Sequence, residues 1–208
     1  MRRSRDVETT RRRRALLATC ALAVWAAHVL VMWRVYDGSP YELLWACHLA
    51  PLLLALGTAL GSVSLTSIAA IGTTLGTTIW LGNLVALGRA PEPTPLLIHV
   101  GTMLLGLASV RAIGWDPRAW WRASLVLFGL AALTRLVPGA ARYDVNLVFR
   151  VWPGLEPVFP HLVPYLLFVA VMVVIATYVI GRALAQLGAR GEVASRSWSR
   201  SRPSSRTI

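Results

Sequence analysis

The sequence contains no lysine and has few charged residues of any kind. All 21 of its basic side chains are arginines and nine side chains are acidic, so charged residues fill 14% of the 208 positions, against 56% for hydrophobic residues. Soluble globular domains carry about 25% charged residues. The scarcity of charge, with a mean hydropathy of +0.59, excludes an ordinary soluble domain and predicts an integral membrane protein.

Cysteine is equally scarce, and Cys20 and Cys47 are the two examples. A rise of about 1.5 Å per helical residue places them about 15 Å apart in depth, beyond the reach of a disulfide, so we expect two free thiols. The sequence has no CxxC or HxxxH pattern and no cluster of carboxylates. It therefore indicates no cofactor and no metal site.

Long apolar runs are abundant, and each is about 20 residues long, which is enough to cross a hydrocarbon layer of about 30 Å. The six runs are Ala15 to Val35, Leu43 to Leu60, Leu65 to Leu87, Leu96 to Ile113, Ala119 to Val137 and Leu162 to Leu184. The charge-free connector GSVS, residues 61–64, separates the second run from the third and leaves five crossings as an alternative. The pattern predicts an all-α polytopic membrane protein, a bundle of six transmembrane helices.

The arginines set the orientation of this bundle. With both termini in the cytoplasm, 16 of the 21 arginines lie on the cytoplasmic side, as the positive-inside rule favours. We expect a basic cytoplasmic tail at 1–14, a six-helix transmembrane domain at 15–186 and a disordered basic cytoplasmic tail at 187–208. The arginine-only basic set is typical of a GC-rich genome, which favours a multi-pass protein of a bacterial inner membrane.

The net charge of +12 lies mainly in the two tails that flank the apolar runs. Topology and attraction to anionic lipid account for it. We therefore expect membrane lipids as partners and no nucleic acid. The sequence leaves the oligomeric state open.

Polar residues inside the apolar runs are costly, and they tend to be functional. Counting the helical rise places Cys47, Asn83, His99 and Arg135 in one layer of the outer half, on four different runs. Further candidates in the outer half are His28, His48, and Asp144 and Asn146 in the long connection GAARYDVNLVFRVWPGLEPVFP. This layer is the predicted site.

Helix geometry constrains the pair Cys47 and His48. Consecutive residues point about 100° apart around a helix, so these two side chains do not naturally pair, and a partner for the thiol has to come from another helix. Pro51 lacks the amide hydrogen that would bond the carbonyl of residue 47, so we expect a bend there. Gly72 and Gly76 have the small-xxx-small spacing that allows close helix contact, which predicts packing between the second and third runs.

The order of these features resembles the YwaF-type multi-pass membrane proteins. A cysteine lies early in the second run, PEPTPLLIH leads into the fourth, and an asparagine-bearing stretch, YDVNLVFRVWPGLEP, precedes the last. The likeness covers about residues 40–180. It implies a thiol-dependent lipid acyltransferase or hydrolase, in which Cys47 is the acyl-accepting nucleophile and His99 its general base, with Asn83 or Asn146 orienting the base or the acyl oxygen.

Two other classes of function stay open at this point. A non-catalytic protein that binds or transports a small molecule, or serves as a membrane partner, would use the polar layer as a pocket. A metal-binding protein would use the cysteine and histidine side chains for zinc or copper.

Overall fold

The computed structural model describes the backbone of residues 2–35 and 39–200, and the side chains of 7–34, 39–41 and 43–187. The described part of the chain is helical, without β-strands. Its elements are α1 (Arg2–Val35), the 3-10 helix η1 (Pro40–Leu44), α2 (Ala46–Leu60), α3 (Val63–Leu87), α4 (Pro93–Leu96), the π-helix η2 (Leu97–Gly101), α5 (Thr102–Ile113), α6 (Ala119–Leu136), the 3-10 helices η3 (Ala140–Tyr143) and η4 (Val145–Leu147), and α7 (Leu162–Arg200).

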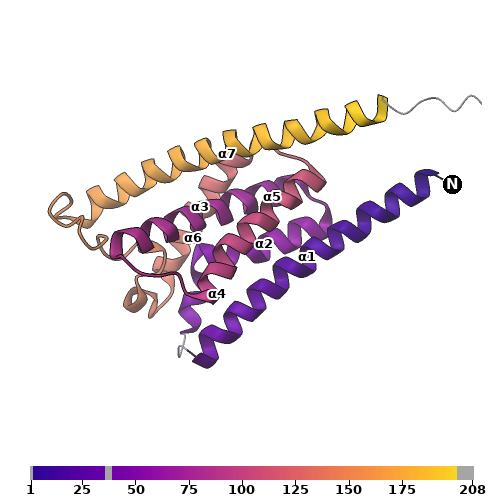
Figure 1. The fold of residues 1–208 in the computed structure, drawn as a ribbon. Helices are drawn as coiled ribbons and strands as arrows, with labels where there is room; N and C mark the ends of the chain where they lie inside the picture. Colours follow the sequence, from indigo (N-terminus) through magenta and orange to yellow (C-terminus); the bar gives the residue numbers. More distant parts are fainter. Residues whose placement is uncertain (1, 36–38, 201–208) are drawn as a thin grey trace, which may run out of the picture.

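Figure 1 shows these helices side by side, with α3 in the middle of the group. Helix α3 packs against α2, α5, α6 and α7, whereas α1 lies along α2 and α5. The start of α1 and the end of α7 lie at the same end of the molecule (Figure 1). Because these two ends lie together, the chain runs along the bundle an even number of times. Helices α4, η2 and α5 follow one another as a single stretch and count as one passage.

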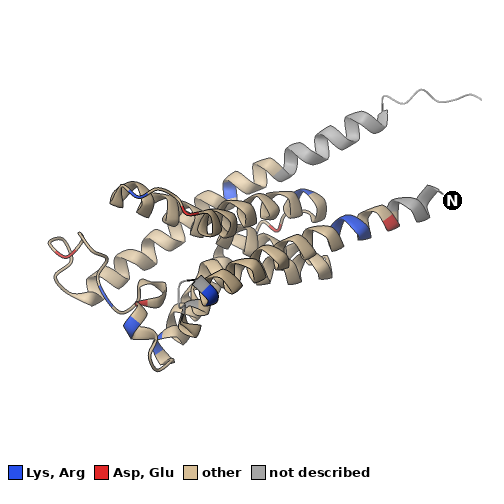
Figure 2. Ribbon diagram, turned by 60° about the horizontal axis from the view of Figure 1, so that its bottom comes forward, with Lys and Arg blue, Asp and Glu red and all other residues tan. Residues whose placement is uncertain are grey.

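Four helical stretches are long and apolar enough to cross a membrane: Val7–Arg34, Val63–Leu87, Pro93–Ile113 and Leu162–Leu187. Helix α7 is especially lipid-compatible, because it leaves a row of large apolar side chains exposed, among them Val163, Leu167 and Val171. Charged residues lie mainly toward the ends of the helices (Figure 2). The structure is thus all-helical with an apolar exterior, compatible with a membrane-embedded protein.

The predicted runs coincide with helices, and their boundaries differ most at three places. Helix α1 begins at Arg2, well before the predicted Ala15. The second run was expected to be helical from Leu43, whereas α2 begins at Ala46 after the separate turn η1. The last helix continues to Arg200, through residues 187–200 that were expected to be unstructured. This segment contains no proline, the residue that most strongly breaks a helix, and its alanine, arginine and glutamate residues favour one. The rest of that tail, 201–208, lies outside the described residues.

The connector at 61–64 is a tight turn between two helices. Gly61 has a φ of 67°, a left-handed conformation that glycine adopts without strain, and it ends α2. The hydroxyl of Ser62 then accepts a hydrogen bond from the amide of Leu65 and caps α3. The second and third apolar runs therefore form two separate helices, and the alternative of one uninterrupted helix through residues 61–64 is excluded.

Helices α2 and α3 pack closely through glycine, as the small-xxx-small spacing predicted. A Cβ placed on Gly57 would lie 2.7 Å from the backbone nitrogen of Thr66, and one on Gly72 would lie 3.2 Å from the Cβ of Ala50. Real Cβ atoms do not approach backbone as closely as 2.7 Å, so the approach at Gly57 needs the absence of a side chain.

A charged network joins the turn before α6 to the start of α3. The carboxylate of Asp116 accepts a bond from the guanidinium of Arg122 at 2.7 Å, and Arg122 also donates to the hydroxyl of Ser64. Burial would raise the pKa of Asp116, but hydrogen bonds from the Arg118 amide and from Ser64, with the charges of Arg122 and Arg118, outweigh burial and lower that pKa. The carboxylate therefore stays ionised and holds this turn.

Candidate functional site

Cys47 lies in the first turn of α2 and faces α3. Its thiol is free and its side chain is half-buried. A Cβ placed on Gly76 would lie 3.2 Å from the Cβ of Cys47, so α3 leaves no more than a hydrogen atom's space beside the cysteine. Because α2 begins at Ala46, Cys47 is the second residue of the helix.

His99 lies in the π-helix η2, on the other side of the same glycine. Its Nδ1 would lie 3.9 Å from a Cβ on Gly76. The ring stacks on the indole of Trp80, with centroids 4.8 Å apart and planes at 11°, and the hydroxyl of Thr77 donates to its backbone carbonyl at 2.8 Å. Both anchors come from α3, so this helix sets the position of the imidazole. Single π-turns inside α-helices often mark functional sites.

Cys47 and His99 thus converge on Gly76 from two different helices. The thiol makes no hydrogen bond to the imidazole or to another side chain in the described part of the chain. Both predicted catalytic residues therefore lie in one region, in a resting arrangement without a formed thiol–imidazole bond. Catalytic hydrogen bonds of free enzymes are often long and tighten only with substrate.

His48 and His28 form a second pair. The Nε2 atoms of the two rings lie 3.1 Å apart, and the rings meet edge to face with centroids 4.9 Å apart. Both side chains are buried, with 3% of His28 and 7% of His48 exposed. Helix geometry predicted that Cys47 and His48 would not pair with each other, and His48 contacts His28 of α1.

Asn146 fixes the start of α2. Its side-chain oxygen accepts a hydrogen bond from the amide of Ala46 at 2.9 Å, and its side-chain nitrogen donates to the carbonyl of Leu44 and to the hydroxyl of Thr134. Asn146 has a φ of 58°, a left-handed conformation that asparagine tolerates better than most residues. All three of these contacts join elements of the fold, so the amide positions the turn that carries Cys47.

The other predicted site residues lie apart from the thiol. Asp144 accepts bonds from the amides of Phe149 and Arg150 and so shapes its own loop. The exposed Arg135 donates to the carbonyl of Val148 at the end of α6. Asn83 is half-buried on α3, seven residues and about 10 Å beyond Gly76.

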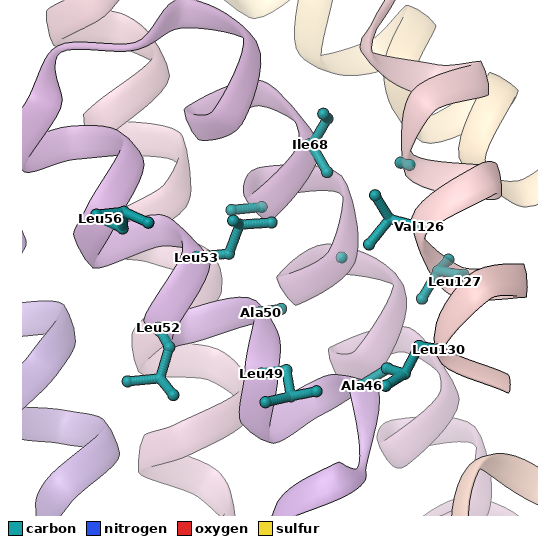
Figure 3. Close-up of a pocket in the computed structure, with 13 residues that line it drawn as sticks. Ala46, Leu49, Ala50, Leu52, Leu53, Leu56, Ile68, Val126, Leu127 and Leu130 are labelled. Atoms are coloured by element: carbon teal, nitrogen blue, oxygen red, sulfur yellow. The ribbon is translucent and has the colours of Figure 1, made fainter. Parts of the chain in front are cut away.

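An apolar groove is lined by Ala46, the residue before Cys47, but not by Cys47 or His99. It has a volume of 380 Å³ and lies between α2, α3 and α6 (Figure 3). Ala46, which precedes Cys47, lines one end, and Gly72, one turn before Gly76, lines the floor. The remaining walls are aliphatic: Leu49, Ala50, Leu52, Leu53, Leu56, Ile68, Ala69, Ala123, Val126, Leu127 and Leu130. Grooves of this size and composition suit a hydrocarbon chain.

Within the described residues, no group of three or more histidine, cysteine, aspartate or glutamate side chains is arranged to hold a metal ion. The metal-binding alternative therefore has no ligand set to support it there.

The residues that sequence reasoning missed are those that support the site. Gly76, Trp80 and Thr77 each position His99 or Cys47, yet glycine was read as packing alone, and the indole and hydroxyl were not assigned. Their spacing could have indicated a shared surface, because Trp80 lies four residues after Gly76 and three after Thr77 on one helix. The π-turn at His99 carries no such local signal.

No protein-family model, no curated protein and no solved structure matches this chain. The resemblance to the YwaF-type proteins therefore stays a hypothesis based on the residues quoted above.

Proposed function

We propose that this chain is a multi-pass membrane protein that transfers or hydrolyses lipid acyl groups through the thiol of Cys47. The observation that carries the proposal is the convergence of Cys47 and His99 on Gly76, where α3 has no side chain to separate them. The apolar groove that Ala46, the residue before Cys47, helps to line supplies the second element that acyl chemistry on a lipid needs.

The nucleophile is Cys47. Cys47 lies in the first turn of α2, and a thiol reacts as its thiolate, so this cysteine needs a base within reach to take its proton. Asn146 holds this turn in place through Leu44 and Ala46.

His99 is the general base. In the first step its imidazole takes the proton of the Cys47 thiol, and the sulfur attacks the ester carbonyl of a lipid. The tetrahedral intermediate collapses, the carbon–oxygen bond breaks, and the departing alcohol takes the proton from the imidazolium. Water or a second alcohol then attacks the Cys47 thioester by the reverse sequence of proton transfers, which restores the thiol and releases an acid or a new ester.

The groove holds the acyl chain. A chain with its carbonyl at Cys47 runs along α2 from Ala46 toward Leu56, between walls that offer only aliphatic side chains. Burial of each methylene there contributes about 0.8 kcal/mol. This gain selects long-chain lipids over short esters.

Six crossings with both termini in the cytoplasm accompany this proposal. Helices α2 and α6 fall outside the four long apolar stretches, because α2 has 15 residues and α6 carries an arginine near each end. The turn η1 extends the path of α2, and the side chains of Arg122 and Arg135 reach polar partners near the ends of α6. The thiol then lies in the outer half of the membrane.

The test is labelling by a lipid-like probe with a thiol-reactive head and a long alkyl tail, applied to protein in lipid nanodiscs. We expect the wild type and Cys20→Ala to be labelled and Cys47→Ala to lose labelling. His99→Gln lowers the rate by at least about tenfold, because a general base contributes about 10²–10⁴-fold. Equal labelling of wild type and Cys47→Ala would end the proposal.

The groove has its own matched pair of variants. Val126 lines the groove, whereas its neighbour Leu125 is 58% exposed and does not. Val126→Trp fills the groove and slows the long-tailed probe while leaving a short thiol reagent unaffected. Leu125→Trp slows neither reagent.

A further inference from the structure

The buried pair His28 and His48 is not used by the chemistry proposed above. Each ring is at least nine-tenths buried, and their Nε2 atoms are joined by one hydrogen bond of 3.1 Å between α1 and α2. Two nitrogens at this distance share a single hydrogen, so one ring donates it and the other presents a bare lone pair.

The other nitrogen of His28, Nδ1, is buried, and the backbone of Thr94 interacts with the same ring. Either ring can donate the shared hydrogen, because a neutral imidazole carries one N–H and one lone pair. The bond joins α1 to α2 in both arrangements.

We infer that the His28–His48 pair is a positioning device that fixes the first turn of α2 on α1 and so aims the thiol of Cys47 at Gly76 and His99. His48 directly follows Cys47, and consecutive helical residues keep an angle of about 100°, so a fixed His48 fixes the direction of Cys47. The inference rests on the proposed function of the thiol. His28 and His48 act through Cys47 and touch no substrate.

The shared hydrogen makes this device sensitive to acid. When both rings carry a second proton, each Nε2 bears an N–H, and two donors with like charges face each other inside an apolar bundle. The bond is then lost and α1 no longer holds the turn. At neutral pH, with one bare Nε2, the bond persists. Acid therefore loosens the thiol and neutral pH fixes it.

The ionisable groups around the pair come from several elements. His99 on η2 is within electrostatic reach of both rings and brings charge of the same sign when protonated. Cys47 is the neighbour on α2, and α3 has no ionisable side chain. The elements at the outer ends contribute Arg34 on α1, Tyr41 on η1 and Glu92 before α4, while Arg111 lies near the end of α5. The side chain of Glu42 lies outside the described residues.

The experiment measures the rate at which N-ethylmaleimide labels Cys47 as a function of pH, by intact mass, in full-length protein carrying Cys20→Ala. Glutamine is the informative replacement, because its amide both donates and accepts but does not take up a proton. We expect the rate of His48→Gln relative to the parent to fall at least about fivefold between pH 8 and pH 4.5, the range in which imidazoles titrate, because acid frees the parent's thiol whereas glutamine keeps the bond. His28→Gln gives the same trend and serves if His48→Gln does not fold.

His161→Gln is the control, because His161 is exposed at the start of α7. Its relative rate stays constant with pH. A constant ratio for both His48→Gln and His28→Gln, or an equal fall for His161→Gln, would overturn the inference. Because maleimide labelling involves no acyl transfer, the ratio reports positioning alone. Loss of the lipid-probe result with the maleimide ratio intact would remove the proposed function and leave the pair as a sensor of pH.

Discussion

At the scale of single residues, the polar side chains of the candidate site divide into two groups. Asn146 and Asp144 have their hydrogen-bonding groups occupied by the backbone of the fold, whereas Cys47 and His99 keep their reactive atoms free of side-chain bonds in the described structure. Depth alone placed Cys47 and His99 in one layer. Depth did not separate structural side chains from reactive ones, because both kinds are polar and have a similar predicted depth.

Asn146 provides the residue-scale prediction. Replacement by alanine removes three hydrogen bonds and leaves the Ala46 amide without its partner, so we expect Asn146→Ala to lower the free energy of unfolding by about 2–3 kcal/mol. Thermal unfolding in detergent measures this loss. Asn83→Ala is the matched control, since Asn83 is also half-buried but forms no hydrogen bond with a described residue. We expect this variant to lose about 0.5 kcal/mol of unfolding free energy or less, as substitutions without such contacts usually do. Equal losses for the two variants would contradict the structural role of Asn146.

At the scale of elements, the apolar runs gave the positions of the main helices because crossing-length runs of leucine, valine and alanine have few alternatives to a helix. Local sequence did not give the start of α2. That start depends on Asn146, which lies 100 residues away from Ala46. The partnership of His28 with His48 likewise depends on how α1 is rotated against α2, and the π-turn at His99 depends on Thr77 and Trp80 of α3.

Close packing of α2 on α3 can be tested with two glycines. At Gly57 a Cβ would lie 2.7 Å from the Thr66 backbone, whereas at Gly82 on α3 nothing lies within 4 Å of it. We expect Gly57→Ala to destabilise the fold by about 1–3 kcal/mol, because the neighbour is backbone and has to shift. Gly82→Ala is neutral or stabilising, by up to about 1 kcal/mol from helix propensity. The account of this interface is wrong if Gly57→Ala unfolds at the wild-type temperature.

At the scale of the whole molecule, the fold collects its reactive groups at one end and its basic segments at the other. Arg11 through Arg14 lie in the first half of α1, whose start is at the end where α7 finishes, and an ion pair joins Arg122 to Asp116. The thiol, the histidines and the Asn146 clamp lie toward the opposite ends of α1 and α3. The exterior between these ends is apolar. This division predicts a site that lipids reach from within the bilayer.

Acylation of Cys47 itself tests the central claim most directly. Full-length protein in nanodiscs, quenched with acid at early times, is digested and the peptide that contains Cys47 is weighed by mass spectrometry. The account predicts the mass of a fatty acyl thioester on that peptide, removable with hydroxylamine, present in Cys20→Ala and reduced at least about tenfold in His99→Gln. A wild-type protein whose Cys47 peptide never carries an acyl group would contradict it.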